Sequence, residues 1–144
     1  MARIGYETGV NFFQGSIMKA AVLTDIGKVE VREVPDPQIE NANDVLIRIQ
    51  RVGVCGSDIH YYRTGRIGSQ VVKFPFIVGH ECAGTVEAVG ESVTSLKPGD
   101  RIAVDPAVSC YKCDQCLAGR ENTCRELKFL GCPGQLCGSL SEYL

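Results

Sequence analysis

Four cysteines in the second half of the chain have the spacing of a metal site. Cys110, Cys113, Cys116 and Cys124 follow one another as Cys-x2-Cys-x2-Cys-x7-Cys. Four thiolates can close a tetrahedral shell around zinc, and each Cys-x2-Cys pair lets one tight turn direct two sulfur atoms at the same point. The residues between the cysteines are mostly polar, so a metal would supply the folding free energy that core burial cannot. The spacing therefore predicts a structural zinc ion.

Two other interpretations of these four cysteines remain open. They could be free or oxidised surface thiols, although so dense a group of thiols is hard to explain in that way. They could also hold an iron–sulfur cluster, because ferredoxin-type sequences repeat Cys-x2-Cys as well. The spacing before the fourth cysteine is longer here than in the bacterial ferredoxin pattern. In that pattern a proline follows the fourth cysteine, whereas none follows Cys124. Zinc is the favoured metal.

A second group of metal-binding side chains is divided between two segments. Cys55 lies at the end of an expected strand, and His80 and Glu81 are neighbours farther along the chain. Each residue alone is a weak signal, since a lone cysteine is usually a small core side chain. Together they offer a thiolate, an imidazole and a carboxylate, all of which bind zinc. Three protein ligands with one open position are typical of a catalytic zinc site.

The segments that must position these side chains have the pattern of β-strands. Apolar and polar residues alternate, and glycine, proline and aspartate mark the turns between them. The expected strands are a hairpin over 20–32 with its turn at 25–28, and single strands at 44–54, 84–90 and 101–104. We assign Asp100 to the turn before the last of these strands and give it no catalytic role. Several short strands predict a barrel-like or sandwich-like β domain, and no glycine-rich dinucleotide fingerprint is visible.

The composition is that of a folded globular protein. The chain has 144 residues, 44% hydrophobic and 22% charged, with a formal net charge of −2. This balance provides no electrostatic reason to expect nucleic acid as a partner. No apolar run approaches the roughly 20 residues that span a bilayer, and no export signal is visible. We therefore expect a cytoplasmic protein without a membrane partner. Its eight cysteines argue against a disulfide framework, since such clusters are more often metal ligands or catalytic groups.

The first 17 residues differ from the rest, because they show neither a strand period nor a helix period. We expect residues 1–17 to be a non-native or disordered extension and Met18 to be the native start. A buried strand within this segment would contradict that expectation.

From Met18 onward the chain resembles the GroES-like N-terminal catalytic domain of the zinc-containing medium-chain alcohol and polyol dehydrogenases. The resemblance rests on the motifs at 53–58, 79–84 and 97–104 and on the four-cysteine lobe, in the family's order. Residues 57–62 and 65–68 further resemble the sorbitol, xylitol and L-idonate dehydrogenase branch. The resemblance implies a mainly β fold, a GroES-like partly open β-barrel with short helices and a zinc-binding lobe at about 106–130.

The resemblance also implies roles for individual residues. Cys55, His80 and Glu81 would ligate a catalytic zinc ion, with water or substrate in the open position. In another branch of the family the glutamate sits behind the metal, so the role of Glu81 stays open. Ser57 would pass the alcohol proton toward solvent, and Tyr61 would line the substrate pocket.

Each of these roles has a structural alternative. Ser57 could cap a following turn or helix, and Tyr61 could be a packing aromatic residue. We expect the remaining cysteines, at positions 82, 132 and 137, to be structural thiols. His60 lies in the motif, but we assign it no ligand role.

Members of this family are more than twice as long and carry a Rossmann domain for NAD(H) or NADP(H). We therefore expect an incomplete catalytic domain, 18–144, whose missing partner is that Rossmann domain, and no dehydrogenase turnover by this chain alone. The substrate would be a small polyol or secondary alcohol, and the full-length protein a homo-oligomer. The alternative is a non-catalytic zinc-binding or interaction domain.

Overall fold

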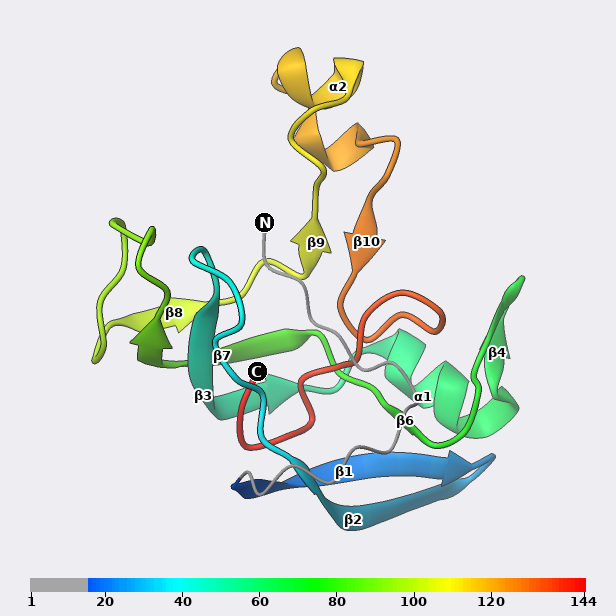
Figure 1. Ribbon diagram of the computed structural model, residues 1–144. Helices are drawn as coiled ribbons and strands as arrows, with labels where there is room; N and C mark the ends of the chain where they lie inside the picture. The colour runs from blue at the N-terminus through cyan, green and yellow to red at the C-terminus, as the bar shows by residue number, and fades with distance from the viewer. Residues whose placement is uncertain (1–15) are drawn as a thin grey trace.

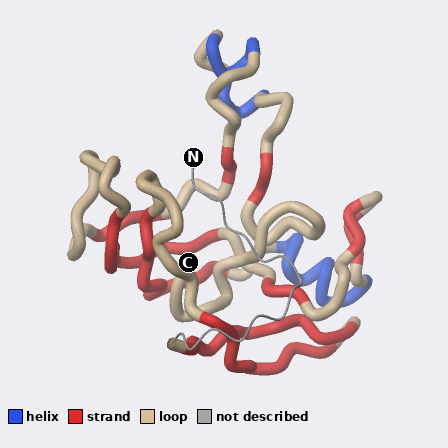
Figure 2. The backbone as a smooth tube through the Cα atoms, in the orientation of Figure 1, coloured by secondary structure: helices blue, strands red, loops and turns tan. Residues whose placement is uncertain are grey.

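The computed structural model describes residues 16–144, and most of the regular structure in this range is β-strand (Figures 1 and 2). The prediction for residues 1–17 lies outside the described residues except for Ser16 and Ile17. Within 16–144 the strands form four small sheets, and none of them closes into a barrel. The mainly β fold with short helices is thus confirmed. No helix in this range is long and apolar enough to cross a membrane.

The first sheet contains the expected hairpin. Strands β1 (Ile17–Asp25) and β2 (Lys28–Pro35) pair antiparallel, and β6 (Phe76–Ile77) pairs with the other edge of β1. Alternate residues of β1 are buried, as the sequence pattern requires. The turn between the strands uses Gly27 at φ 72°, a left-handed conformation that glycine adopts at no steric cost.

The second sheet has the order β3-β7-β8, formed by β3 (Val45–Gly53), β7 (Glu81–Val89) and β8 (Arg101–Ala103). Strand β7 begins three residues earlier than the sequence pattern predicts. The reason is its partner, because β3 continues to Gly53, which pairs directly with Glu81. The ladder therefore extends into the His-Glu motif.

Helix α1 (Gly56–Thr64) follows β3 and leads into a small third sheet, formed by β4 (Arg66–Ile67) and β5 (Gln70–Val71). Its first turn is capped by the Asp58 carboxylate, which accepts a hydrogen bond from the Cys55 N–H, and it ends at Gly65 with φ 68°.

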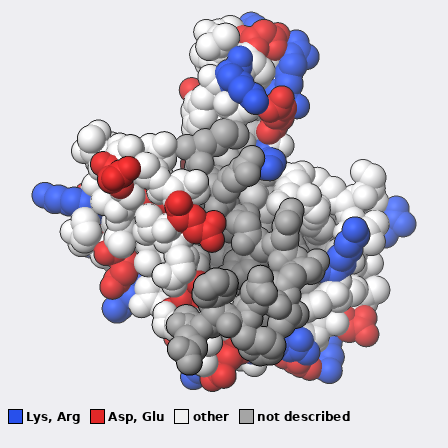
Figure 3. All heavy atoms as spheres, viewed as in Figure 1, with Lys and Arg blue, Asp and Glu red and all other residues white. Residues whose placement is uncertain are grey.

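A lobe projects from this body, at the top of Figure 1. Strands β9 (Ala107–Val108) and β10 (Lys128–Phe129) pair antiparallel at its base. Helix α2 (Asp114–Leu117) and the 3-10 helix η1 (Glu121–Thr123) form its tip. Figure 3 shows acidic and basic side chains mixed on its surface. Elements this short cannot bury a conventional core.

The end of the described chain connects the first two sheets. Ala21 of β1 donates a hydrogen bond to the Leu140 carbonyl at 2.8 Å, and Ile47 of β3 donates to the Leu144 carbonyl at 2.8 Å. This C-terminal segment, red in Figure 1, therefore lies between β1 and β3.

Candidate functional site

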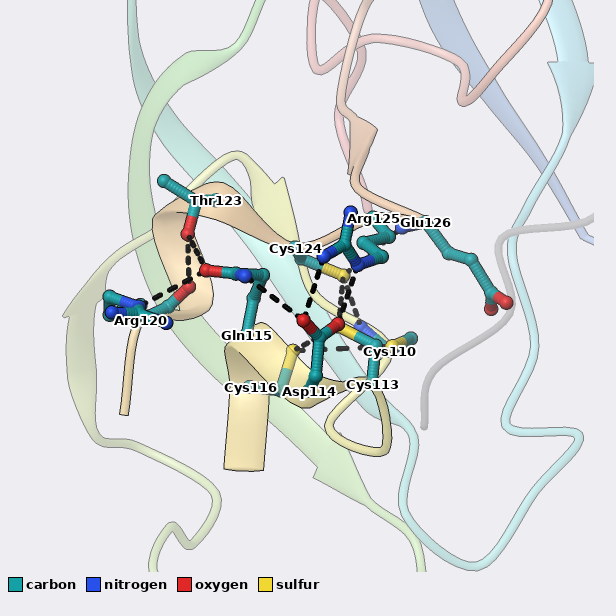
Figure 4. Close-up of polar contacts among 10 residues, drawn as sticks. All are labelled: Cys110, Cys113, Asp114, Gln115, Cys116, Arg120, Thr123, Cys124, Arg125 and Glu126. Carbon is teal, nitrogen blue, oxygen red and sulfur yellow. Dashed lines mark hydrogen bonds and ion pairs between the residues drawn. The ribbon is translucent and has the colours of Figure 1, made fainter. Parts of the chain in front are cut away.

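The four cysteines of the lobe direct their sulfur atoms at one another, as the ligands of a tetrahedral metal site do (Figure 4). The Sγ atom of Cys113 lies 3.6 Å from that of Cys116 and 4.0 Å from that of Cys124, and Cys110 and Cys116 are 4.0 Å apart. Sulfur atoms at about 2.3 Å from a tetrahedral zinc ion are separated by about 3.8 Å. The described residues thus fit zinc without rearrangement.

Backbone amides in the lobe favour negative charge on sulfur, the form that binds zinc. The N–H groups of Cys110 and Glu126 donate to Cys124 Sγ at 3.3 and 3.4 Å. The Arg125 N–H, followed by the Cys116 N–H, lowers the pKa of the Cys113 thiol to about 6. Burial raises the pKa of Cys116 to about 12. The Cys116 thiol therefore stays protonated near neutral pH without a metal, whereas a bound zinc ion would stabilise its thiolate.

One ion pair also joins parts of the lobe. Arg125 Nε and Nη2 lie 2.5 and 2.7 Å from the two oxygens of the Asp114 carboxylate (Figure 4). Both side chains are more than half exposed. Because water and salt screen such a pair, it contributes little to stability, and we expect the lobe to depend on its metal.

The second group of predicted ligands also converges. The donor atoms of Cys55, His80 and Glu81 all lie within 4.8 Å of one another. Cys55 directly precedes α1, and Glu81 is the first residue of β7. The pairing of Gly53 with Glu81 explains the convergence, since it brings the ends of the two motifs together across the sheet. A thiolate, an imidazole and a carboxylate at this separation fit one zinc ion with an open position.

Asp58 holds this group together, a role that the sequence did not suggest. Its side chain is 4% exposed. One oxygen accepts the Cys55 N–H at 3.0 Å, and the other accepts the Gly79 N–H at 3.1 Å and lies 3.7 Å from His80 Nδ1. A carboxylate behind a ligand histidine orients the ring and raises its basicity. The available signal was the position of Asp58 three residues after Cys55, typical of a capping box.

We predict that Asp58→Asn weakens zinc binding at Cys55, His80 and Glu81 by about 10- to 100-fold. It should also lower the free energy of unfolding by about 1.5–3 kcal/mol, because a buried charged acceptor is lost. Zinc titration and thermal melts measure both effects. Asp100→Asn is the matched control, since Asp100 also accepts a backbone N–H, from Lys97, but in an exposed turn. Equal effects of the two substitutions would contradict the assignment.

The Glu81 side chain depends on the absence of a side chain at position 53. A Cβ atom built on Gly53 would lie 2.6 Å from Glu81 Oε2 and 3.1 Å from Glu81 Cβ. Glycine at this position therefore leaves the space that the carboxylate occupies.

We predict that Gly53→Ala displaces the Glu81 carboxylate and weakens zinc binding at this site by about tenfold or more. Competition with a chelating dye measures the affinity. Gly56→Ala serves as the control, because a Cβ atom there meets nothing within 4 Å. If Gly53→Ala binds zinc as tightly as the unaltered chain, Glu81 is not a direct ligand.

A pocket of about 430 Å³ opens beside His80, which is within the usual range for small-molecule sites. Ser57, the predicted proton relay, and Tyr61, the predicted substrate contact, both line it. Ser57 does not cap α1, because Cys55 and Asp58 do so. Pocket residues that the sequence analysis did not identify include Gln70, Phe129, Cys132 and Gln135. Gln70 is distant in sequence from the stretch 129–135 that supplies the other three, so no local motif marks the group.

Tyr61 combines a packed ring with a hydrogen-bonded hydroxyl, and its substrate role stays a prediction. Its ring packs in a buried cluster with Leu23, Val72 and Val78, while its hydroxyl donates a hydrogen bond to Gln70 Oε1 at 2.9 Å. Burial raises the pKa of Tyr61 to about 12, so the hydroxyl stays a hydrogen-bond donor at neutral pH.

Three cysteines lie outside both metal groups, and burial raises the pKa of each thiol: Cys82, Cys132 and Cys137. A raised pKa disfavours the reactive thiolate. A structural role for these thiols remains the prediction.

Comparison with known proteins identifies the family. Residues 41–144 match the model of the alcohol dehydrogenase GroES-like domain. Sorbitol dehydrogenase of Bacillus subtilis is 48% identical over 127 residues, which are 88% of this chain and 35% of that protein. A probable D-xylulose reductase A of Aspergillus clavatus is 43% identical over 122 residues, 85% of this chain and 34% of the relative.

A solved structure agrees with these relatives. Alcohol dehydrogenase TADH from Thermus sp. ATN1 superimposes with a TM-score of 0.79 at 35% identity, over 88% of this chain and 36% of that one. The chain spans about a third of the length of the curated relatives it matches. The resemblance stated from the motifs is confirmed: this chain belongs to the alcohol dehydrogenase GroES-like domain family.

Proposed function

We propose that this chain is the catalytic-domain portion of a zinc-dependent dehydrogenase. The enzyme would oxidise a small polyol or secondary alcohol to a ketone and transfer the hydride to NAD or NADP. The observation that carries the proposal is the convergence of Cys55, His80 and Glu81 within 4.8 Å, with His80 also lining a pocket. A purely structural zinc module needs neither an open ligand set nor a pocket beside it.

Each residue of the site has a distinct task in this proposal. Cys55, His80 and Glu81 would hold the zinc ion, which supplies a Lewis acid that polarises the alcohol oxygen. Ser57, in the same pocket, would carry the hydroxyl proton toward solvent. The Tyr61 hydroxyl, held by Gln70, would orient a second substrate hydroxyl.

The lobe would bind a second, structural zinc ion, so we propose two zinc ions per chain. The nicotinamide cofactor would be held by a Rossmann domain that follows this region in a longer protein. A homo-oligomeric state of that longer protein and a cytoplasmic location remain predictions.

A chimera tests the proposed function. After Leu144 it carries the residues that follow the matched region in B. subtilis sorbitol dehydrogenase, a relative 48% identical over that region. We expect the chimera to oxidise sorbitol or xylitol with NAD or NADP, and the chain alone to show no turnover. His80→Ala should abolish the activity.

A folded chimera that contains two zinc ions and binds nucleotide, yet oxidises neither polyols nor simple secondary alcohols, would favour the alternative. The chain would then be a non-catalytic zinc-binding domain. Polyol oxidation by the chain alone would instead refute the need for a second domain.

A further inference from the structure

Strand β10 connects the two groups of predicted zinc ligands. It follows shortly after Cys124 of the lobe and pairs with β9 between the tip of the lobe and the body (Figure 1). Its last residue, Phe129, lies against His80: the two ring centroids are 5.4 Å apart, and the rings meet edge to face at an angle of 64°. A short stretch of chain therefore links a ligand of the lobe to a ligand of the other site.

The neighbours of Phe129 extend this connection on both sides. Leu127 packs against the cysteine cluster of the lobe and also lines the pocket beside the second metal site. Leu130 is 2% exposed and belongs to a buried cluster with Cys82, the residue that follows Glu81. Phe129 itself lines the pocket as well. This segment thus contacts the cysteine cluster at one end and the neighbourhood of Glu81 at the other.

The ladder between β9 and β10 is too short to be stable by itself. It has two residue pairs, and even a longer isolated two-stranded hairpin is marginal in water. At the body end the Phe129 N–H donates to Gln135 Oε1 at 2.7 Å, a bond that is exposed to water. At the lobe end Cys110 follows β9 and Cys124 precedes β10, and the Cys110 N–H donates to Cys124 Sγ at 3.3 Å. A metal ion bound to both sulfur atoms would therefore hold the two strands together at that end.

We propose that Phe129 is a positioning residue for His80, and that metal bound in the four-cysteine lobe holds Phe129 in place. An aromatic edge packed against a ring favours one orientation of that ring, and the orientation of a ligand histidine affects metal affinity. Filling the lobe should then raise the metal affinity of Cys55, His80 and Glu81 by about tenfold, which is within the range for coupled sites. The proposal rests on the two metal sites of the proposed function but not on its reaction.

A double-mutant cycle on the purified chain tests the coupling. Cobalt is the probe, because its absorption distinguishes a four-thiolate site from a mixed-ligand site. Cys113→Ser should weaken cobalt binding at the mixed-ligand site by about tenfold, and Phe129→Leu should weaken it by a similar factor while the lobe is filled. Because both changes break the same connection, the double variant should bind no more weakly than either single variant. Unchanged affinity in either single variant, or losses that multiply in the double variant, would overturn the proposal.

Two further variants separate the ring contact from general stability. Phe129→Tyr retains an aromatic ring and should retain the affinity. Phe76→Leu is the matched control, since Phe76 is partly buried in β6, outside the pocket and both metal groups. Equal losses in Phe76→Leu and Phe129→Leu would overturn the proposal. If hydrogen exchange shows that Phe129→Leu unfolds β3 and β7, Leu127→Ala replaces it in the cycle, because Leu127 contacts the cysteine cluster.

The coupling must also act in the opposite direction, because linkage between two binding sites is reciprocal. His80→Ala should therefore weaken cobalt binding by the lobe by about the same factor of ten. His60→Ala should leave it unchanged, since His60 is exposed and belongs to neither metal group. Equal lobe affinity in His80→Ala and in the unaltered chain would overturn the proposal.

Imidazole NMR of the zinc-loaded chain measures the ring contact directly. The chain has two histidines, so His60 on α1 provides an internal reference. The His80 resonances should carry a ring-current shift from Phe129 that decreases in Cys113→Ser and in Phe129→Leu but remains in Phe129→Tyr. Unchanged His80 resonances in zinc-loaded Cys113→Ser would overturn the link to the lobe.

These measurements need no turnover, so their outcome is separable from that for the proposed reaction. Coupled metal sites in a protein that oxidises no alcohol would support the positioning role alone. Independent metal sites in a chimera that oxidises polyols would overturn the positioning role alone.

Discussion

Replacing Cys113 by serine is expected to remove one of the two proposed zinc ions per chain and to unfold the projecting lobe, while the two larger sheets stay folded. The buried cluster of the lobe consists mainly of the ligands themselves, Cys110, Cys116 and Cys124, with Cys113 and Leu127 packed against it. Without the metal, the only cluster that the described residues of the lobe form is this one of cysteines and Leu127. Structural zinc contributes about 10–16 kcal/mol of apparent binding free energy in zinc-finger peptides, so the loss should unfold the lobe outright.

Metal analysis together with hydrogen exchange measures this result. The zinc content should fall by one ion, and amide protection should be lost over α2 and η1 but kept in β3 and β7. Cys137→Ser is the matched control, since Cys137 is a partly buried thiol outside both metal groups. It should retain both zinc ions and lose only about 1 kcal/mol of stability. If Cys113→Ser retains the zinc and the protection, the lobe is not a zinc site.

His80→Ala is expected to remove the other zinc ion and to leave the lobe intact. His80 is 9% exposed, and Asp58 lies behind its ring at 3.7 Å. Removal of a zinc ligand should cost more than removal of its supporting partner, so we expect affinity at this site to fall by more than about 100-fold. In the chimera, dehydrogenase activity should disappear with the metal.

The chain offers a matched control, because it contains only two histidines, His60 and His80. His60 is exposed on α1 and is not part of either metal group. His60→Ala should therefore keep two zinc ions. Cobalt substitution distinguishes the sites, since the four-thiolate site and the mixed-ligand site differ in their absorption spectra. If His80→Ala retains both zinc ions, His80 is not a zinc ligand, and the proposed catalytic site is wrong.

Some features of this protein follow from local sequence. The four-cysteine spacing predicts a tetrahedral site because turns of two intervening residues already determine where neighbouring sulfur atoms point. The hairpin at 20–32 was predictable for a similar reason, since alternation and an Asp-x-Gly turn are local signals. In both cases the cooperating residues are close to one another in the sequence.

Other features depend on contacts between distant segments, which no local pattern specifies. The meeting of Cys55 with His80 and Glu81 depends on the register that pairs Gly53 with Glu81. A shift of one residue would turn every side chain of the strand to the opposite face. The sequence motifs therefore named the candidate ligands, but only the sheet brings their donor atoms within 4.8 Å.

The same distinction explains what the sequence analysis missed. The supporting role of Asp58 is a consequence of its burial and of its contacts with Gly79 and His80, which depend on the assembled sheets. The sequence by itself determined the family, the types of ligand and the five described strands of three or more residues, but not the five two-residue strands. The former are encoded by residue identity and short spacing. Only the tertiary structure decided which distant groups share a site, because antiparallel register and burial arise from the whole fold.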